Sequence, residues 1–191
     1  RGRMDERYDM VRSVVGERYI YIRNYMPHKP YGQHVSYMFQ TTTTQVWKKL
    51  FEKGKLNKAQ SHFWKTKPAE ELYDLQKDPD EVTNLAQSQE HAAILKKMRK
   101  AHFSHIRKIR DVGFLPEGEI HSRSIGSTPY EIARDSNKYP FEKIISAAEL
   151  ATSLKKKDLP EIAQLLMDND SAVRYWGAIG LLTHKKAGTQ A

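Results

Sequence analysis

The sequence contains no cysteine among its 191 residues. Without a thiol, the chain has no disulfide, no thiolate metal ligand and no cysteine nucleophile, and the redox compartment in which it works stays open. It also has no apolar run of about eighteen residues, which is the minimum for a membrane-spanning helix. We therefore expect no membrane span.

Both ends of the sequence lack the features of a complete protein. The chain begins Arg1-Gly2-Arg3-Met4, with no initiator methionine in first place and no charged-then-apolar leader. At the other end, His184-Lys185-Lys186 directly follows an amphipathic segment, without a compact closing element. We therefore expect a fragment of a longer protein, in which an export signal cannot be read.

The positive charge of the chain is concentrated in one short segment. The formal net charge is +9, with 39% hydrophobic and 29% charged residues, a composition typical of folded soluble chains. Residues 1–86, 87–111 and 112–191 carry +4, +5 and 0, respectively. More than half of the excess therefore lies in residues 87–111.

A basic amphipathic helix is predicted over residues 89–110. Its apolar stripe consists of Ile94, Leu95, Met98, His102, Ile106 and Ile109. Its basic residues are Lys96, Lys97, Arg99, Lys100, Arg107, Lys108 and Arg110. Either the basic face is simply solvated, or it faces a polyanion. No nucleic-acid recognition motif accompanies it, so nucleic acid is not the expected partner.

Short strands and helices alternate in the first part of the chain. Residues 9–15 and 18–23 predict a β-hairpin across Gly16-Glu17, and residues 24–37 predict a long loop. The spacing predicts a helix over residues 45–53 that stops at Gly54, and a short helix from Asn57. Residues 71–75 predict a strand, closed by a turn at residues 77–80.

The last part of the chain is predicted to be helical. Residues 112–137 have little periodicity and are expected to form an extended linker or surface strap. A helix follows Tyr139-Pro140, with a stripe that ends at Leu154. Residues 159–167 and 171–182 predict a helix pair with Asp170 as N-cap, a pattern typical of a HEAT-like repeat.

Linked short motifs give the sequence a family resemblance. The segment Pro68–Ala86 (PAEELYDLQKDPDEVTNLA) resembles the C-terminal signature of the type I sulfatases, in which Glu-Leu-Tyr-Asp-Leu, Asp-Pro-x-Glu and Asn-Leu-Ala recur in this order. The upstream runs RMDERYDMVRSV and RYIYIRNYMPHKPYGQH are similar to segments of bacterial sulfatases, particularly those with a HEAT-repeat tail.

The resemblance implies that the catalytic machinery lies elsewhere. Type I sulfatases hydrolyse sulfate esters with a formylglycine made from a Cys/Ser-x-Pro-x-Arg motif, assisted by calcium, in a large N-terminal domain. That motif is absent here. The chain is expected to hold no cofactor, to be inactive alone and to pack against that domain. The parent's substrate would be a sulfated small molecule or polysaccharide, and its location periplasmic or secreted.

The expected fold class is α+β. Residues 1–111 would form the small antiparallel sheet and packing helices of the sulfatase C-terminal subdomain, residues 112–138 a linker or strap, and residues 139–191 a truncated HEAT-like segment. Signature residues are assigned structural roles, among them a cap by Asn84 on the following helix. They are Glu71, Leu72, Tyr73, Asp74, Leu75, Asp78, Pro79, Glu81, Asn84 and Leu85.

Candidate substrate contacts lie in the loop and at the start of the chain. In sulfatases this subdomain lies beside the active-site cleft, so the resemblance places the loop near a sulfated sugar. A lysine there can pair with an anion, histidine and glutamine can donate hydrogen bonds, and tyrosine can stack on a sugar ring. The candidates are His28, Lys29, Tyr31, Gln33, His34, Arg1 and Arg3, with a satisfied surface loop as the alternative.

Two metal sites and one other function are alternatives to these predictions. Asp74, Asp78, Asp80 and Glu81 depart from calcium-loop spacing. His102 and His105 can share a helix face but have no third ligand nearby. Neither set is expected to bind metal. The alternative function is a non-catalytic scaffold that engages a polyanion or a protein through residues 89–110 and the helical tail.

Overall fold

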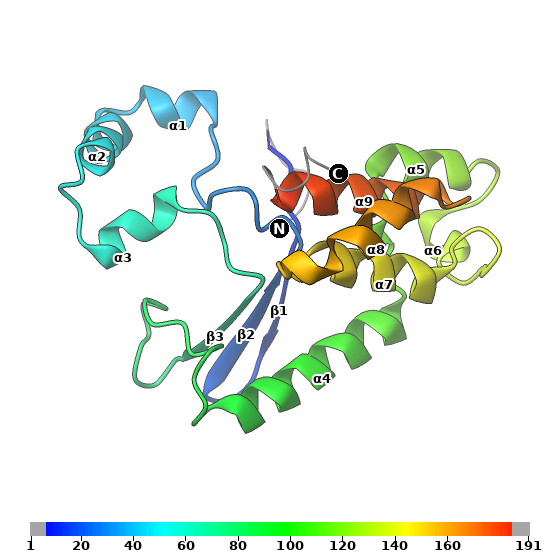
Figure 1. Ribbon diagram of the computed structural model, residues 1–191, viewed down its shortest axis with the longest axis horizontal. Coiled ribbons are helices and arrows are strands. Elements are labelled where there is room, and N and C mark those ends of the chain that lie inside the picture. Colours follow the sequence, from blue (N-terminus) through cyan, green and yellow to red (C-terminus); the bar gives the residue numbers. More distant parts are fainter. Residues whose placement is uncertain (1–6, 185–191) are drawn as a thin grey trace. The chain divides into compact units, whose positions relative to one another are not determined.

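The computed structural model describes residues 7–184, which form an α+β structure of one small sheet and several helices (Figure 1). The expected fold class is therefore confirmed. The chain divides between Leu95 and Lys96 into two compact units. Across the described residues, no helix combines the length and apolarity needed to cross a membrane.

The sheet of the first unit has three antiparallel strands in the order β1-β2-β3. They are β1 (Val11–Val15), β2 (Tyr19–Asn24) and β3 (Glu70–Asp74). Tyr21 of the central strand stands opposite Val14 on one side and Leu72 on the other. The predicted hairpin and the predicted third strand are confirmed, and their bounds differ from the prediction by no more than two residues.

The central strand β2 buries the face that carries its tyrosine and arginine side chains, not the face that carries its isoleucines. Tyr21 and Arg23 are buried, whereas Ile20 and Ile22 on the opposite face are only half-buried. The Arg23 guanidinium donates to the carbonyl of Ala69 at 2.9 Å and lies 4.9 Å from the ring centroid of Tyr25. These contacts compensate the cost of removing a cation from water.

The predicted helices of the first unit are also present. They are α2 (Thr42–Glu52) and α3 (Lys58–Ser61). The unit also contains α1 (Ser36–Gln40) and the 3-10 turn η1 (His62–Trp64), which were not predicted. Asn57 and Gln60 form a reciprocal capping box at the start of α3. Gly54, at φ +64°, follows the end of α2 in the left-handed conformation that glycine favours.

The predicted basic helix is α4 (Ala92–Ile109), which begins in the first unit and continues into the second. Its side chains follow the expected stripe, since Leu95, Met98, His102 and Ile106 are buried. Ile109 departs from it and is 45% exposed.

The second unit is helical after α4, and residues 112–137 differ from the expected strap. Phe114 and Leu115 are fully buried, so this segment belongs to the core of its unit. The elements are η2 (Val112–Phe114), α5 (Glu117–Arg123), α6 (Pro129–Ile132), α7 (Phe141–Ala151), η3 (Lys156–Asp158), α8 (Leu159–Gln164), η4 (Leu165–Met167) and α9 (Ser171–His184).

Helices α7, α8 and α9 pack around small residues. Asp170 caps α9, as predicted, by accepting a hydrogen bond from the backbone N–H of Ala172 at 2.8 Å. The buried Gly180 of α9 approaches Ala151 and Ile162 closely. Leu154, expected on the buried stripe, is instead 42% exposed and has φ +58°. The HEAT-like character of this unit stays a prediction.

We expect Gly180→Ala to lower the free energy of unfolding by about 1–3 kcal/mol, because an added methyl group overpacks the contact between helices. A Cβ there would lie 2.6 Å from Ile162 Cγ2 and 3.0 Å from Ala151 Cα. Urea unfolding monitored by circular dichroism measures the change. The matched control is Gly118→Ala in α5, where a Cβ meets no atom within 4 Å. That variant should be neutral or stabilised by up to about 1 kcal/mol, and equal stabilities for both variants would contradict the described packing.

Candidate functional site

The loop between β2 and α1 lies against residues 62–67. Gly32 donates its backbone N–H to the carbonyl of Phe63 at 2.8 Å, and Pro30 and Thr66 form an isolated β-bridge. A Cβ at Gly32 would stand only 2.2 Å from Phe63 Cε1. Glycine is therefore required there by the close approach of an aromatic ring.

Two of the candidate substrate contacts fasten the loop to the segment before β1. Lys29 Nζ donates to the carbonyl of Tyr8 at 2.8 Å, and Gln33 Nε2 donates to the same carbonyl at 3.4 Å. Burial lowers the pKa of Lys29, partly offset by the charge of Asp9. Both side chains thus make intramolecular contacts.

The buried carboxylate of Glu71 is the shared hydrogen-bond acceptor of the polar groups beneath the loop. Glu71 accepts hydrogen bonds from Asn24 Nδ2 at 2.5 Å, from the Tyr31 hydroxyl at 2.8 Å and from the Tyr73 hydroxyl. Burial, reinforced by the Glu71 carboxylate, raises the pKa of Tyr31 and of Tyr73. Both phenols therefore stay protonated and serve as donors.

A buried ion pair lies beside this carboxylate. Lys67 Nζ is 3.2 Å from Asp9 Oδ2, and both side chains are almost completely buried. Lys67 also donates to the carbonyl of Lys29 at 3.1 Å and lies 5.7 Å from the ring centroid of Tyr31. Burial lowers the pKa of Lys67, against the opposing effect of Asp9. Lys67, which lies shortly before β3, thus connects the segment before β1 with the loop that follows β2.

The other candidate contacts are scattered. His28 is half-buried, and His34 is exposed, with its ring centroid 4.6 Å from that of Phe39. Arg1 and Arg3 lie outside the described residues. The loop residues remain predicted substrate contacts, but they do not converge on one point.

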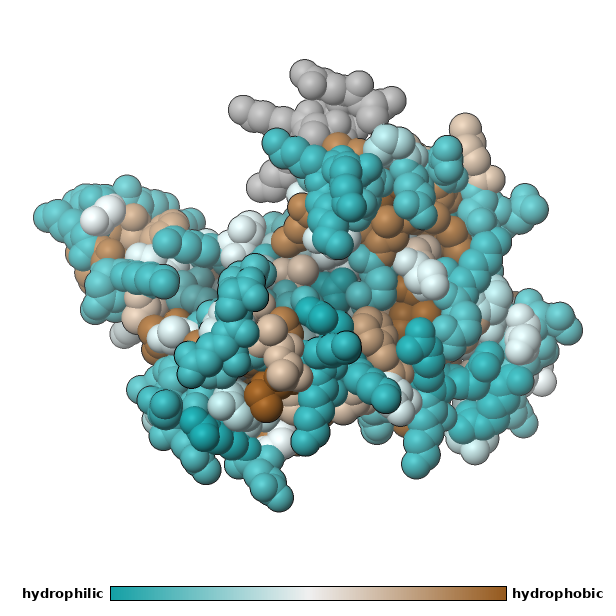
Figure 2. Space-filling model, turned by 60° about the horizontal axis from the view of Figure 1, so that its bottom comes forward, coloured by the Kyte–Doolittle hydropathy of each residue, from teal (hydrophilic) through white to brown (hydrophobic). Residues whose placement is uncertain are grey.

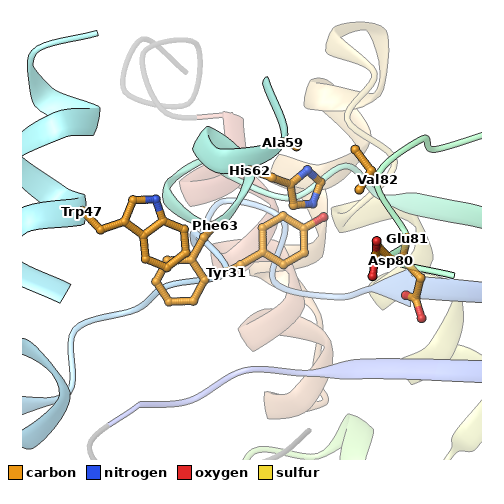
Figure 3. A pocket seen from close by; sticks show the side chains of 8 residues that line it. All are labelled: Tyr31, Trp47, Ala59, His62, Phe63, Asp80, Glu81 and Val82. Atoms are coloured by element: carbon orange, nitrogen blue, oxygen red, sulfur yellow. The ribbon is translucent and has the colours of Figure 1, made fainter. Parts of the chain in front are cut away.

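A pocket of about 260 Å³ opens beside Tyr31 (Figure 3). Its aromatic side consists of Tyr31, Trp47, His62 and Phe63. Trp47 and Phe63 are stacked with ring centroids 4.7 Å apart, and Tyr31 and His62 lie 4.4 Å apart. Asp80 and Glu81 form the acidic side, opposite the stacked rings in Figure 3, and Ala59 and Val82 complete the lining.

The acidic side of the pocket is held by the turn after β3. Glu81 has φ +54°, which is uncommon for a residue with a side chain. The Asp78 carboxylate fixes this turn by accepting the backbone N–H groups of Val82 at 3.1 Å and Thr83 at 2.7 Å. Burial raises the pKa of Glu81, as do the charges of Glu71 and Asp78.

The pocket unites three residues named from the sequence with others that the sequence did not indicate. Tyr31 is a predicted substrate contact, Glu81 is a predicted structural residue, and Asp80 and Glu81 belong to the disfavoured calcium loop. Trp47, His62 and Phe63 were not predicted as site residues. The dense aromatic run His62-Phe63-Trp64 was the available signal. Aromatic faces can stack on a ligand, and carboxylates can accept hydrogen bonds from hydroxyl groups.

The signature segment forms a strand and a turn, but its asparagine acts differently from the prediction. Asn84 does not cap α4, which begins at Ala92. Instead Asn84 Oδ1 accepts the backbone N–H of Leu72 at 3.0 Å, and its Nδ2 donates to the carbonyl of Glu70 at 3.1 Å. An amide side chain can mimic a neighbouring strand in this way, so Asn84 extends the hydrogen bonding of β3.

Two of the four carboxylates of the calcium-loop alternative, Asp74 and Asp78, are engaged within the protein. Asp74 forms two hydrogen bonds with the Arg18 guanidinium, at 2.9 and 2.6 Å, and Asp78 binds backbone N–H groups of its own turn. His102 is buried on α4 and His105 is exposed. Within residues 7–184, no group of three His, Asp or Glu residues is placed to hold a metal ion.

Comparisons with known proteins relate the chain to one sulfatase. A protein from Formosa agariphila described as an ulvan-active sulfatase is 37% identical over 119 residues, which are 62% of this chain. The match spans only 20% of that protein's length. No family model matches the chain, and no solved structure does. The chain is thus related to a sulfatase over more than half of its residues.

We expect part of the stability of the first unit to be lost as the pH falls from about 4 toward 2. The hydrogen bonds from Arg18 hold the pKa of Asp74 at about 2, below its ordinary value of 3.8. The unfolded chain therefore binds more protons in this window, and acid favours unfolding. The excess stability of the wild type over Asp74→Asn should be largest above pH 4 and shrink toward pH 2, as measured by urea unfolding.

Glu17→Gln is the control for this titration, because Glu17 is exposed in the hairpin turn. A difference between wild type and Asp74→Asn that stays constant from pH 6 to pH 2 would contradict the role assigned to the pair.

Proposed function

We propose that this chain is the C-terminal, non-catalytic region of a sulfatase whose intact form hydrolyses sulfate esters. The observation that carries the proposal is the 37% identity over 119 residues to a sulfatase. That relative is described as ulvan-active, and we extend this to a polysaccharide sulfate as the parent's substrate class. The proposal includes export of the intact parent, which would be periplasmic or secreted.

The structure of the signature segment supports this assignment. Its first half forms the edge strand β3, and its second half returns along that strand, with Leu85 donating its backbone N–H to the carbonyl of Leu72 at 2.8 Å. The motif therefore serves to fold a small sheet. A fold-building motif is the kind of sequence that related proteins retain in order.

In this proposal the reaction chemistry belongs to the remainder of the parent. The formylglycine and calcium implied by the resemblance would reside in its N-terminal domain. Among the described residues no carboxylate set fits a calcium ion. This chain would supply a preorganised border of the substrate cleft, since Lys67, Asp9 and Glu71 fix the loop His28 to His34 from below.

We expect the product of the complete gene to release sulfate from an aryl sulfate and the chain alone to release none. The reason is that the chain carries no Cys/Ser-x-Pro-x-Arg motif and hence no precursor of the nucleophile. Sulfate release is measured by ion chromatography after expression with a formylglycine-generating enzyme. The matched control replaces the Cys or Ser of that upstream motif by alanine.

Turnover by the chain alone would overturn the proposed division of roles. An upstream gene sequence without the motif, or a matured product that cleaves no sulfate ester, would overturn the sulfatase assignment itself.

A second candidate function rests on the basic face of α4. Lys96, Lys97, Lys100 and Lys108 are exposed, whereas the Arg107 guanidinium binds the Glu142 carboxylate at 3.1 Å. In Figure 2, which turns the lower side of Figure 1 toward the viewer, hydrophilic side chains cover most of the face shown. A row of exposed lysines on one helix attracts polyanions through long-range electrostatics.

We expect replacement of Lys96, Lys97 and Lys100 by glutamine to lower the salt concentration at which the chain elutes from heparin. The control removes the same charge from another exposed triplet, Lys155, Lys156 and Lys157. Salt screens the attraction of both triplets to heparin. The first triplet should therefore have the larger effect on retention only if α4 forms a local binding surface. If both triplets lower the elution salt concentration equally, net charge alone causes retention, and this candidate function is ruled out.

A further inference from the structure

We propose that the pocket beside Tyr31 is a binding site for an uncharged sugar ring. This goes beyond the proposed function, which concerns a sulfate ester handled elsewhere in the parent. The inference rests on the lining of the pocket, all of which lies in the first unit, and its test needs no turnover.

The aromatic side of the pocket is rigid. Trp47 and Phe63 support one another as a stacked pair, and Trp47 Nε1 donates to the carbonyl of Gln60 at 3.0 Å. Behind them, Trp64 makes an edge contact with each ring, at 5.2 and 5.0 Å. Flat apolar faces held in this way can stack on the C–H face of a sugar ring at little cost in side-chain entropy.

The opposite side of the pocket supplies polar groups for hydroxyls. Asp80 and Glu81 line the pocket on the side of Tyr31 that is away from the stacked rings (Figure 3). Charge-assisted hydrogen bonds from hydroxyl groups to carboxylates are stronger than those between neutral groups. Glu81 has an uncommon left-handed backbone conformation in a turn held by Asp78, so the direction in which its side chain leaves the backbone is set before a ligand binds.

The same carboxylates exclude an anionic ligand. A sulfated or carboxylated sugar would bring its negative charge next to Asp80 and Glu81, and the nearby cation Lys67 is already paired with Asp9. Like charges at short range are repulsive, most strongly where water is partly excluded. The pocket therefore does not suit the sulfate-bearing unit of a substrate.

An organic cation fits less well than a neutral ring. Aromatic sites for cations offer open ring faces, but here Lys67 already lies 5.7 Å from the ring centroid of Tyr31. The volume of about 260 Å³ is just below the range of about 300–1,000 Å³ for drug-sized ligands, as expected for a single ring.

The test follows the Trp47 indole N–H signal of the whole chain by NMR during titration with glucose, galactose, xylose and rhamnose. We expect at least one of these sugars to shift this signal with millimolar affinity. A monosulfate ester of the same sugar and tetramethylammonium should each bind at least about fivefold more weakly. The Trp176 indole, buried in the second unit, is the internal reference whose signal should not shift.

Four variants separate stacking, charge and folding. Trp47→Ala should weaken sugar binding about five- to tenfold, followed through nearby backbone amides, whereas Trp47→Phe should retain most of it. The double variant Asp80→Asn with Glu81→Gln should lower the ratio of the affinity for the unsulfated sugar to that for the sulfated sugar. Tyr37→Ala, an exposed aromatic outside the pocket, should change nothing.

The proposal is overturned if none of the neutral sugars perturbs the pocket, if the sulfated sugar binds as well as the neutral one, or if only tetramethylammonium binds. None of these outcomes bears on sulfate release by the complete gene product, so the two proposals fail separately.

Discussion

The buried carboxylate of Glu71 is the contact on which the first unit depends. It receives donors from β2, from the loop and from its own strand, so one negative charge joins β3 to β2 and to the loop, which are distant from β3 in sequence. A buried carboxylate is costly unless its oxygens are satisfied, and each donor here offsets that cost. The position of Tyr31, and with it one wall of the pocket, follows from this arrangement.

The elements of the fold could be predicted where the pattern is local. Alternation in β2, the spacing in α2 and α4, and the cap at Asp170 each depend on neighbours within a few residues. The prediction for residues 112–137 was wrong, because the glycines and prolines of this segment indicated an extended strap where the structure has two short helices. Burial of Phe114 depends instead on Trp176, whose indole donates to the Phe114 carbonyl at 2.9 Å. No local pattern shows a contact of that range.

The candidate site was harder to predict for the same reason. The sequence pointed to Lys29 and Gln33 as groups free for a ligand, yet both bind the carbonyl of Tyr8. Conversely, Trp47 and Phe63 belong to different helical elements and gain meaning only when they stack. The turn carrying Asp80 approaches them from beyond β3. Residue type predicts what a side chain can do, whereas tertiary contacts decide which ligand it can reach.

The close approach of Gly32 to Phe63 has a consequence for how this region can vary through evolution. Any side chain at position 32 must intrude on the ring at position 63, so the two positions are not independent. Homologues that lose the large ring are those free to replace the glycine, and homologues that keep it are not. Paired substitution at these two positions would therefore record which lineages retained the aromatic wall.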